Sequence, residues 1–333
     1  MMSFNKLENF FRQYLLIVAV STGFTIACFL EYTPLSDPYK AEFIKNSHRV
    51  LPTLIFFVLF FSYAKIKIKE MGLRRWHFIA LFIQLAVSVL CALWLQANPS
   101  SEYFIIVESI LVCFIAPTAA GAAAISSKLG GNESSITTYT ILSNLLAAVF
   151  IPLLFPLFTS SMEGTFTENF SIILNKVFPI IMIPLALALT IKAFFKKLHT
   201  FLITRCKDMS FYLWGISLTL VFANAILNFF SSSESNLMLF ILSIVSLFCT
   251  LFQFLSGKAV GHLEGQRVSS GQALGQKNMV IGLWVSLSFL SPTAAIAPGA
   301  YAIFQNAFNA WQLWYRARKD SILKLQGKPP YKE

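Results

Sequence analysis

Charged residues are scarce in this sequence. Only 12% of the 333 residues are Asp, Glu, Lys or Arg, whereas 56% are hydrophobic, and the mean hydropathy is +0.67. An ordinary soluble domain has about twice this charged fraction. The composition therefore excludes a chain of soluble domains and predicts an integral membrane protein. The net charge of +11 does not indicate a nucleic-acid partner, because the basic residues lie in short segments beside apolar runs, where they act as topology signals.

Residues that build metal and catalytic sites are also few. The five cysteines lie inside apolar runs without a CxxC pair, and the chain has four histidines. This pattern predicts no disulfide framework, no metal site and no resident cofactor. The sequence lacks a Ser-His-Asp set, a Walker motif and a dinucleotide-binding fingerprint. An intramembrane enzyme needs clustered His, Asp or Glu within the apolar runs, so we expect no enzymatic activity.

Long apolar runs fill the chain instead. A membrane-spanning helix needs about 20 mostly apolar residues, and charged residues, Pro or Gly/Ser/Asn clusters separate runs of this kind. We therefore predict an all-α polytopic membrane protein of about ten transmembrane helices. The runs fall at 12–30, 46–64, 76–96, 103–128, 134–158, 171–194, 209–230, 236–256, 270–291 and 293–315.

Lys and Arg are distributed unevenly over the connections between these runs. One set of alternate connections is rich in them, as at 65–75 and 192–207, and includes both ends of the chain. The opposite set has mainly acidic residues, among them Glu31, Glu102 and Glu168. Because basic loops stay in the cytoplasm, we expect a multi-pass protein of the cell (inner or plasma) membrane with both termini cytoplasmic.

Two of the runs contain helix-breaking residues. Irregular backbone at membrane depth is tolerated only where it is buried in protein or lines a cavity. Paired interruptions in the two halves of a chain are typical of a transporter binding site. We therefore expect the two breaks to be in contact at mid-membrane. The first break has Pro117, Thr118 and Gly121, and the second has Gly275, Gln276, Lys277 and Asn278.

A weak internal repeat relates the two halves. The stretch 139–148 matches 301–310, with Tyr, Ile, Asn and Ala in register at an offset of 162 residues (301 minus 139). Asn144 and Asn306 are equivalent in this register. Five helices in each half force the second half to be inverted. The expected units are a first repeat at 1–158, a second, inverted repeat at 159–320 and a cytoplasmic tail at 321–333.

Two stretches resemble the bile acid:sodium symporter family. They are "APTAAGAAAISSKLGGNESSITTYTILSNLLAAVFIPLLFPL" at 116–157 and "ALGQKNMVIGLWVSLSFLSPTAAIAPGAYAIFQNAFNAW" at 273–311. They look like the family's fourth and fifth helices and its ninth and tenth helices. The resemblance implies a core domain and a panel domain, with the broken helices crossing at the substrate cavity. It also implies a secondary transporter of small organic anions, usually coupled to sodium.

The sequence departs from the family at the expected sodium ligands. Ala122 and Ala123 stand where the family has Ser-Asn. Ala273 stands where it has a sodium-binding glutamate, and Lys277 where it has a glutamine. Methyl groups supply no oxygen ligand, and an ammonium about 4 Å from a cation repels it by about 4 kcal/mol at an effective dielectric of about 20. We therefore expect a transporter that does not use the family's sodium sites.

Lys277 is the only basic residue that we place near the bilayer centre, where it costs about 2.5–3.5 kcal/mol. Three interpretations stay open. In the first, its ammonium occupies the vacated ion site and ties the crossing helices together through Thr140, Gln84 and freed carbonyl oxygens. In the second, it also contacts a substrate carboxylate or loses its proton during transport. In the third, the break is misplaced and Lys277 lies near a surface.

Other polar residues within the apolar runs are further candidates for the substrate or ion site. Gln84 lies where the family has a glutamine, and Thr140 is at a matching position. Glu108 either faces an outer vestibule or is an interfacial acid. Asn144 and Asn306 either bond the broken segments or join helices. The expected partners are a small organic anion and the lipid bilayer. The alternative from another class is a membrane receptor or sensor that keeps the fold without transport.

Overall fold

A computed structural model of the chain describes residues 4–33, 37–67, 70–159, 164–232, 234–327, 329 and 332–333. Over these residues the fold is all-helical, with thirteen α-helices and two short 3₁₀ segments. In chain order these elements are α1 (Phe4–Tyr32), α2 (Asp37–Tyr63), α3 (Arg75–Ala97), α4 (Phe104–Ile115), α5 (Ala122–Lys128), α6 (Glu133–Leu154), η2 (Phe155–Leu157), α7 (Phe166–Phe194), α8 (Lys196–Thr204), α9 (Met209–Ser231), α10 (Asn236–His262), α11 (Arg267–Gly275), α12 (Met279–Phe289), η3 (Pro292–Ala295) and α13 (Ile296–Leu325).

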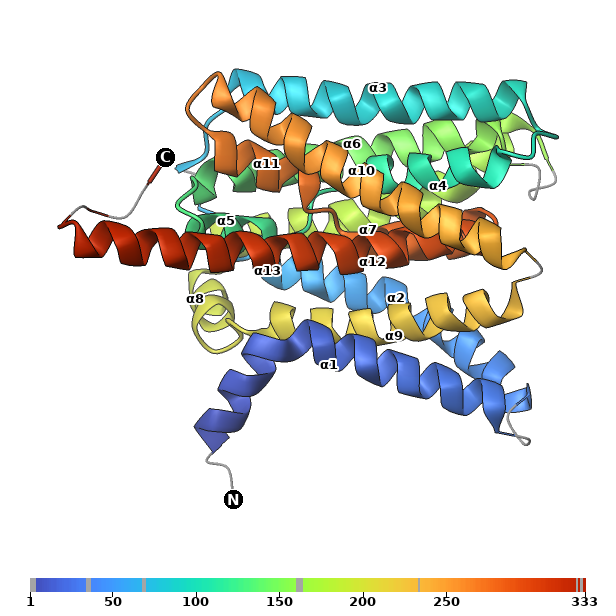
Figure 1. Cartoon of the computed structure of the whole chain (residues 1–333), viewed down its shortest axis with the longest axis horizontal. Helices are drawn as coiled ribbons and strands as arrows, with labels where there is room; N and C mark the ends of the chain where they lie inside the picture. Colours follow the sequence, from blue (N-terminus) through green and yellow to red (C-terminus); the bar gives the residue numbers. More distant parts are fainter. Residues whose placement is uncertain are drawn as a thin grey trace.

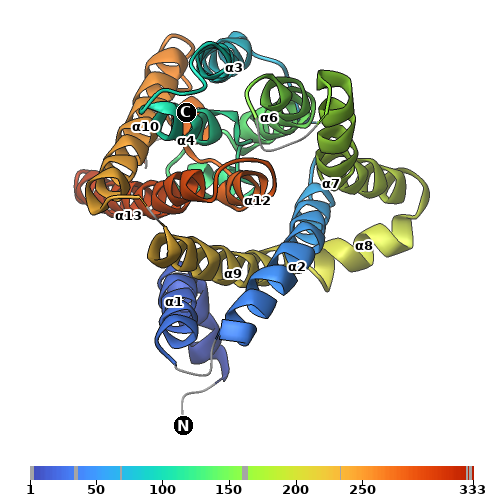
Figure 2. The same cartoon turned by 90° about the vertical axis from the view of Figure 1, so that its right-hand side faces the viewer.

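The long helices run side by side along one axis of the molecule (Figure 1). Seen end-on, they form two groups (Figure 2). One group contains α1, α2 and α9, and the other contains α3, α4, α6, α10, α12 and α13. Helix α7 joins them, because it packs against α2 on one side and α6 on the other. The two interrupted helix pairs, α4–α5 and α11–α12, both belong to the larger group.

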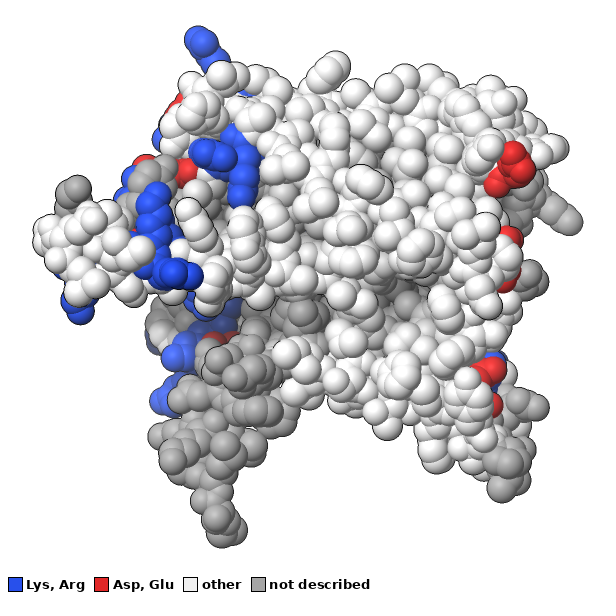
Figure 3. All heavy atoms as spheres, viewed as in Figure 1, with Lys and Arg blue, Asp and Glu red and all other residues white. Residues whose placement is uncertain are grey.

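On the face that Figure 3 shows, exposed charge lies at the two ends of this bundle. Lys and Arg gather at the end that contains α5, α8 and the end of α13, which we call the basic end. Acidic residues predominate at the opposite end, which we call the acidic end, and the belt between them is almost free of charge. An uncharged belt between two polar rims is what a surface facing lipid hydrocarbon requires.

Six helices of the described residues are long and apolar enough to cross a membrane. The expected fourth and ninth runs do not appear among them, because each is divided at its break into two shorter helices. The helix of the last run, α13, continues to Leu325, beyond the predicted end at 315. The six spans are Pro38–Tyr63, Arg75–Ala97, Glu133–Leu157, Phe166–Phe194, Met209–Ser231 and Asn236–His262, and shorter apolar helices are Ile17–Tyr32, Phe104–Ile115 and Met279–Phe289.

One helix has no counterpart among the predicted apolar runs. Helix α8 lies across the direction of the long helices at the basic end (Figures 1 and 2). It exposes Leu198 and Phe201 on its surface, and it begins with Lys196 and Lys197. A short helix with apolar and basic residues, perpendicular to the spans, has the character of an interfacial helix. Its nine residues are too few for a search based on spanning length.

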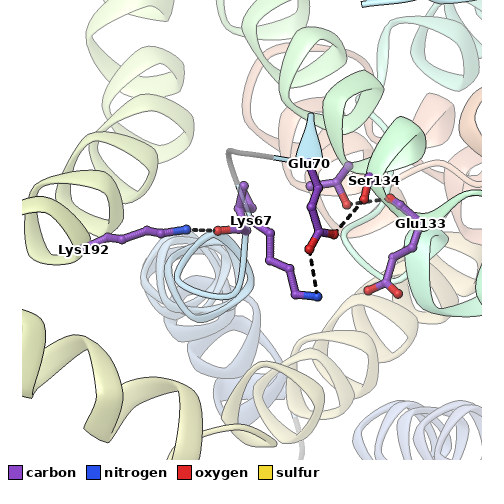
Figure 4. Close-up of polar contacts among 7 residues, drawn as sticks. Lys67, Glu70, Glu133, Ser134 and Lys192 are labelled. Carbon is purple, nitrogen blue, oxygen red and sulfur yellow. Dashed lines mark hydrogen bonds and ion pairs between the residues drawn. The ribbon is translucent and has the colours of Figure 1, made fainter. Parts of the chain in front are cut away.

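The connection from α2 to α3 is held by side chains of several helices (Figure 4). Lys192 of α7 donates a hydrogen bond to the carbonyl oxygen of Ile66. Glu70 forms an ion pair with Lys67 at 3.3 Å and accepts a hydrogen bond from the hydroxyl of Ser134, at the start of α6, at 3.1 Å. This connection therefore ties the smaller helix group to the larger one at the basic end.

Candidate functional site

The two helix breaks meet inside the larger group. Helix α4 ends before Pro117, and Ala116 is extended (φ −53°, ψ 133°), as is expected before a proline. Thr118 and Lys277 form an isolated antiparallel bridge. The N–H of Ala119 donates to the carbonyl oxygen of Gln276 at 2.9 Å. The expected contact between the breaks is therefore confirmed.

The bridge also satisfies backbone groups that the breaks release. The N–H of Asn278 donates to the carbonyl oxygen of Pro117 at 2.7 Å. The hydroxyl of Thr118 donates to the carbonyl oxygen of Ala273 at 2.7 Å. The hydroxyl of Tyr301 donates to the carbonyl oxygen of Gly275 at 2.8 Å. Non-helical backbone deep in an apolar bundle is stable only when its polar groups are paired in this way.

Lys277 is completely buried, with 0% of its surface exposed. Its ammonium donates a hydrogen bond of 3.1 Å to the carbonyl oxygen of Phe114, in the last turn of α4. The carbonyl end of a helix carries a partial negative charge, so it stabilises a cation there. Among the described residues, no carboxylate forms an ion pair with this ammonium. The interpretation that puts Lys277 near a surface is therefore wrong.

Gln305 holds the backbone of Lys277 from α13. Its side-chain oxygen accepts from the N–H of Lys277 at 2.9 Å, and its amide donates to the carbonyl oxygen of Lys277 at 3.1 Å. Ser143 holds the backbone of the first break in a similar way, because its hydroxyl oxygen accepts a hydrogen bond from the N–H of Thr118 at 3.1 Å. Neither Ser143 nor Gln305 was among the site residues expected from the sequence. The internal repeat relates the two positions, because 143 plus the offset of 162 is 305.

Gln84 of α3 supports the first break. Its amide lies 3.4 Å from the carbonyl oxygens of Ile115 and Ala116, and its own oxygen accepts from Tyr139 at 3.4 Å and Ser143 at 3.3 Å. The expected tie from Lys277 through Gln84 is therefore replaced by a direct bond to the Phe114 carbonyl. A second glutamine that the sequence analysis did not name, Gln253 of α10, donates to the carbonyl oxygen of Cys113 at 3.1 Å.

Thr140, Asn144 and Asn306 bond their own helices. The hydroxyl of Thr140 donates to the carbonyl oxygen of Ile136 at 2.9 Å, so it is not the expected partner of Lys277. Asn144 donates to the carbonyl oxygen of Thr140, and Asn306 to that of Ala302, each at 2.7 Å. Of the two interpretations of the asparagines, direct bonding of the broken segments is not observed. The side-chain oxygen of Asn144 is buried without a hydrogen-bond partner.

Glu108 of α4 is buried, with 2% of its surface exposed. Its carboxylate accepts hydrogen bonds from the N–H of Ser291, at 3.3 Å, and from the hydroxyl of the same residue. Ser291 lies in the turn between α12 and η3. Glu108 therefore clamps α4 to this turn, and it faces neither an open vestibule nor the solvent.

The crossing meets the smaller helix group at a small cavity. Asn278 and Val280 line it from the crossing, Ile55 and Val58 from α2, and Trp214 and Ser217 from α9. It has room for about one water molecule. Gln276, two residues before Asn278 in the chain, has its side-chain oxygen buried and unpartnered. Gly121 adjoins it, because a methyl group there would stand 3.8 Å from the Gln276 amide.

These observations define a multi-pass helical membrane protein with two interrupted helices that cross in its interior. The family model described as the Sodium Bile acid symporter family matches residues 52–232, which is more than half of the chain. The chain belongs to this family and is a membrane transporter, not an enzyme. A search among curated proteins gave no match. The matched residues include the first break, whereas the second break with Lys277 lies beyond them.

Proposed function

We propose that this protein is a secondary transporter of a small organic anion in which the Lys277 ammonium takes the place of a coupling cation. The observation that supports this most directly is the burial of that ammonium at the crossing, hydrogen-bonded to the Phe114 carbonyl. A charged side chain in the interior of a membrane-spanning bundle costs free energy. One that is present there is therefore a candidate for a functional role. A substrate carboxylate is the partner that such a charge can recruit from solution.

The sodium sites of the family do not fit the residues present. Ala122 and Ala273 are both fully buried and present methyl groups, which cannot replace the hydroxyl and carboxylate ligands expected at these positions. The carbonyl oxygen of Ala273 already accepts from Thr118, and that of Phe114 accepts from Lys277. We therefore assign transport without sodium to this protein.

The proposed architecture has ten membrane spans in two inverted five-helix repeats, at 1–158 and 159–320, followed by a tail at 321–333. Interrupted spans four and nine correspond to α4–α5 and α11–α12. Three equivalent pairs support the repeat: Ser143 with Gln305, Tyr139 with Tyr301, and Asn144 with Asn306. Members of the first pair hold the backbone of opposite breaks, and members of the third make the same bond within their helices.

The basic end is proposed to face the cytoplasm of the cell, with both termini on that side of the inner or plasma membrane. The separation of basic and acidic residues in Figure 3 supports this orientation. Substrate would then bind where the crossing faces α2 and α9, at the small cavity lined by Asn278. In this conformation the cavity has room for about one water molecule, so the two helix groups must move apart to admit a substrate.

Two coupling modes follow from the chemistry of an ammonium. If Lys277 stays charged, the protein is a uniporter or an exchanger of anions. If its ammonium releases a proton to water on one side of the membrane and regains one on the other, each cycle couples the anion to one proton. The Phe114 carbonyl accepts a hydrogen bond from either form of the amine, so both modes are compatible with the observed contact.

Uptake into proteoliposomes tests this proposal. A thermal-shift screen of purified protein against organic anions first supplies the substrate. Uptake should not change with sodium at constant pH, and it should be lost in Lys277→Ala. Lys277→Gln should not restore sodium dependence, because Ala273 still supplies no carboxylate. Uptake that depends on a pH gradient selects the proton-coupled mode, whereas uptake that rises steeply with sodium refutes the proposal. Anion binding without any uptake supports the receptor or sensor alternative.

A further inference from the structure

The carboxylate of Glu333 is bound at the basic end of the second interrupted helix. It accepts hydrogen bonds from the N–H of Val268 and from the N–H of Ser269 at 3.1 Å. The hydroxyl of Ser269 donates to it at 2.7 Å. These N–H groups belong to the first turn of α11, where a helix has unpaired donors and a partial positive charge. Figure 1 places the C-terminal end of the chain beside α5 and α11.

The same site includes the turn between α5 and α6. The N–H of Glu333 donates to the carbonyl oxygen of Gly130 at 2.8 Å. Arg316 of α13 donates to that of Leu129, also at 2.8 Å. The N–H of Asn132 donates to the hydroxyl oxygen of Ser269 at 2.7 Å. Both interrupted helices are therefore held together at this rim through groups that Glu333 contacts.

A second feature of the rim is a buried hydroxyl group without a partner. Ser126 of α5 is fully buried, and its hydroxyl has no hydrogen-bond partner. Its oxygen faces Gly131, because a methyl group there would stand 2.2 Å from this oxygen and 2.9 Å from that of Ser269. The absence of a side chain at Gly131 thus leaves room for both hydroxyl groups, of which Ser269 bonds the Glu333 carboxylate and Ser126 does not.

The internal repeat provides an independent comparison. At the acidic end the carboxylate of Glu108 bonds the N–H and the hydroxyl of Ser291. The equivalent positions are 270 (108 plus 162) and 129 (291 minus 162). Position 270 is a serine whose buried hydroxyl has no partner. At the acidic end the interrupted helix itself provides the carboxylate, from Glu108. At the basic end the carboxylate comes from Glu333, which is distant in sequence.

We infer that the first turn of α11, with the Ser269 hydroxyl, is a carboxylate-binding site, and that Glu333 occupies it as a latch that keeps the basic-end rim of the crossing closed. The inference goes beyond the proposed transport function, although the comparison between the rims uses the proposed repeat. Release of Glu333 removes its own link between the start of α11 and the α5–α6 turn, and leaves the bond from Asn132 to Ser269 as the contact that must still give way. A soluble carboxylate can then bind in its place.

Hydrogen–deuterium exchange of the purified full chain in nanodiscs tests the latch without any transport assay. Glu333→Gln and Glu333→Ala should speed the exchange of the Val268 and Ser269 amides about tenfold or more, as expected for the loss of charge-assisted hydrogen bonds. Lys332→Gln, a change at the exposed neighbouring residue, should leave this exchange as it is. Unchanged exchange in both Glu333 variants overturns the site.

Two further readouts test the chemistry and the closure. Sodium acetate should restore protection of the two amides in Glu333→Ala, whereas sodium chloride at the same concentration should not. If acetate has no effect beyond that of chloride, the site is not a carboxylate site. Backbone amides 276–279 at the crossing should also exchange faster in the Glu333 variants. If only the amides of Val268 and Ser269 respond, Glu333 binds at the rim without closing it, and the latch is refuted.

Discussion

At the scale of single residues, a substitution of Lys277 can distinguish a structural role of its ammonium from a functional one. A buried charge costs free energy unless it is paired, and among the described residues no carboxylate pairs with Lys277. We therefore expect Lys277→Met to unfold thermally at the same temperature as the parent protein or at a higher one, and to lose the stabilisation by the substrate anion. Differential scanning fluorimetry with and without the anion measures both effects.

The control for this substitution is Lys258→Met. Lys258 lies in α10 with its ammonium 5.1 Å from the centre of the Phe308 ring, and its side chain adjoins Gly271 of α11, which comes before the break. This variant should keep its response to the anion. If Lys277→Met instead unfolds at a much lower temperature than Lys258→Met, the ammonium is a structural tie, and the transport role assigned to it is wrong.

Glu108 offers a second prediction at the same scale. Glu108→Ala removes the acceptor of two hydrogen bonds from Ser291, and an unsatisfied buried donor costs about 1–3 kcal/mol. We expect a loss of stability of this size in detergent, measured by thermal unfolding. Glu102→Ala is the matched change at an exposed acidic residue, where the effect should stay within about 0.5 kcal/mol. Equal stability of the two variants would contradict the clamp.

At the scale of elements, glycines determine how closely α10 and α11 approach. A methyl group at Gly257 would stand 2.6 Å from the carbonyl oxygen of Ser270, and one at Gly275 would stand 2.4 Å from the Phe254 ring. Gly257→Ala must therefore push the two helices apart, and we expect a loss of about 1–3 kcal/mol. Gly72→Ala is the control, because nothing lies within 4 Å of its added methyl group.

Thermal unfolding of the two glycine variants decides this prediction. Gly72→Ala should stay within about 0.5 kcal/mol of the parent protein. A Gly257→Ala protein as stable as Gly72→Ala would mean that the backbone contact with Ser270 adjusts without cost.

Parts of this arrangement follow from the sequence, and parts do not. Pro117 and Gly275 mark the breaks, because proline and glycine disfavour a continuous helix wherever they occur. The partner of Gln253 could not be read in the same way, whereas Gln305 is related to Ser143 by the repeat offset. Gln253 contacts Cys113, which is 140 positions away, and only the packing of α10 on α4 brings them together. Local sequence patterns do not predict a contact between residues so far apart in the chain.

Short elements were missed for a different reason. Helix α8 has nine residues, and the apolar patterns that predict a span need about 20. The role of Glu333 was also invisible, because an acidic residue near a basic tail is typical of solvated sequence. Lys277 was recognised as exceptional from its position alone, but its actual partner, the Phe114 carbonyl, is a backbone group that no sequence pattern distinguishes.

At the scale of the whole molecule, the proposed topology can be tested by labelling cysteines. Ser36 and Lys69, the positions at which the sequence suggests placing tags, lie outside the described residues. Gly72 and Glu102 are exposed residues at the two ends of α3. A membrane-impermeant thiol reagent added to intact cells should label Glu102→Cys and not Gly72→Cys. Labelling of both variants from outside would refute the orientation.

The native cysteines provide the background of this experiment. The protein has five free thiols, of which Cys113 and Cys249 are buried, and the parent protein measures the labelling of all five. Permeabilised cells should give equal labelling of the two variants. This control separates a residue on the inner side from one that is inaccessible to the reagent.

The fixed ammonium at the crossing also determines how membrane voltage acts on the proposed carrier. A carrier that binds a monoanion beside a charged Lys277 crosses as a neutral complex, and it returns empty with one positive charge. Voltage therefore acts on the empty return step, by about 2.3 kcal/mol per 100 mV if the charge traverses the whole field. An inside-negative potential draws the empty site inward. The resting carrier then faces the cytoplasm, ready to load from that side.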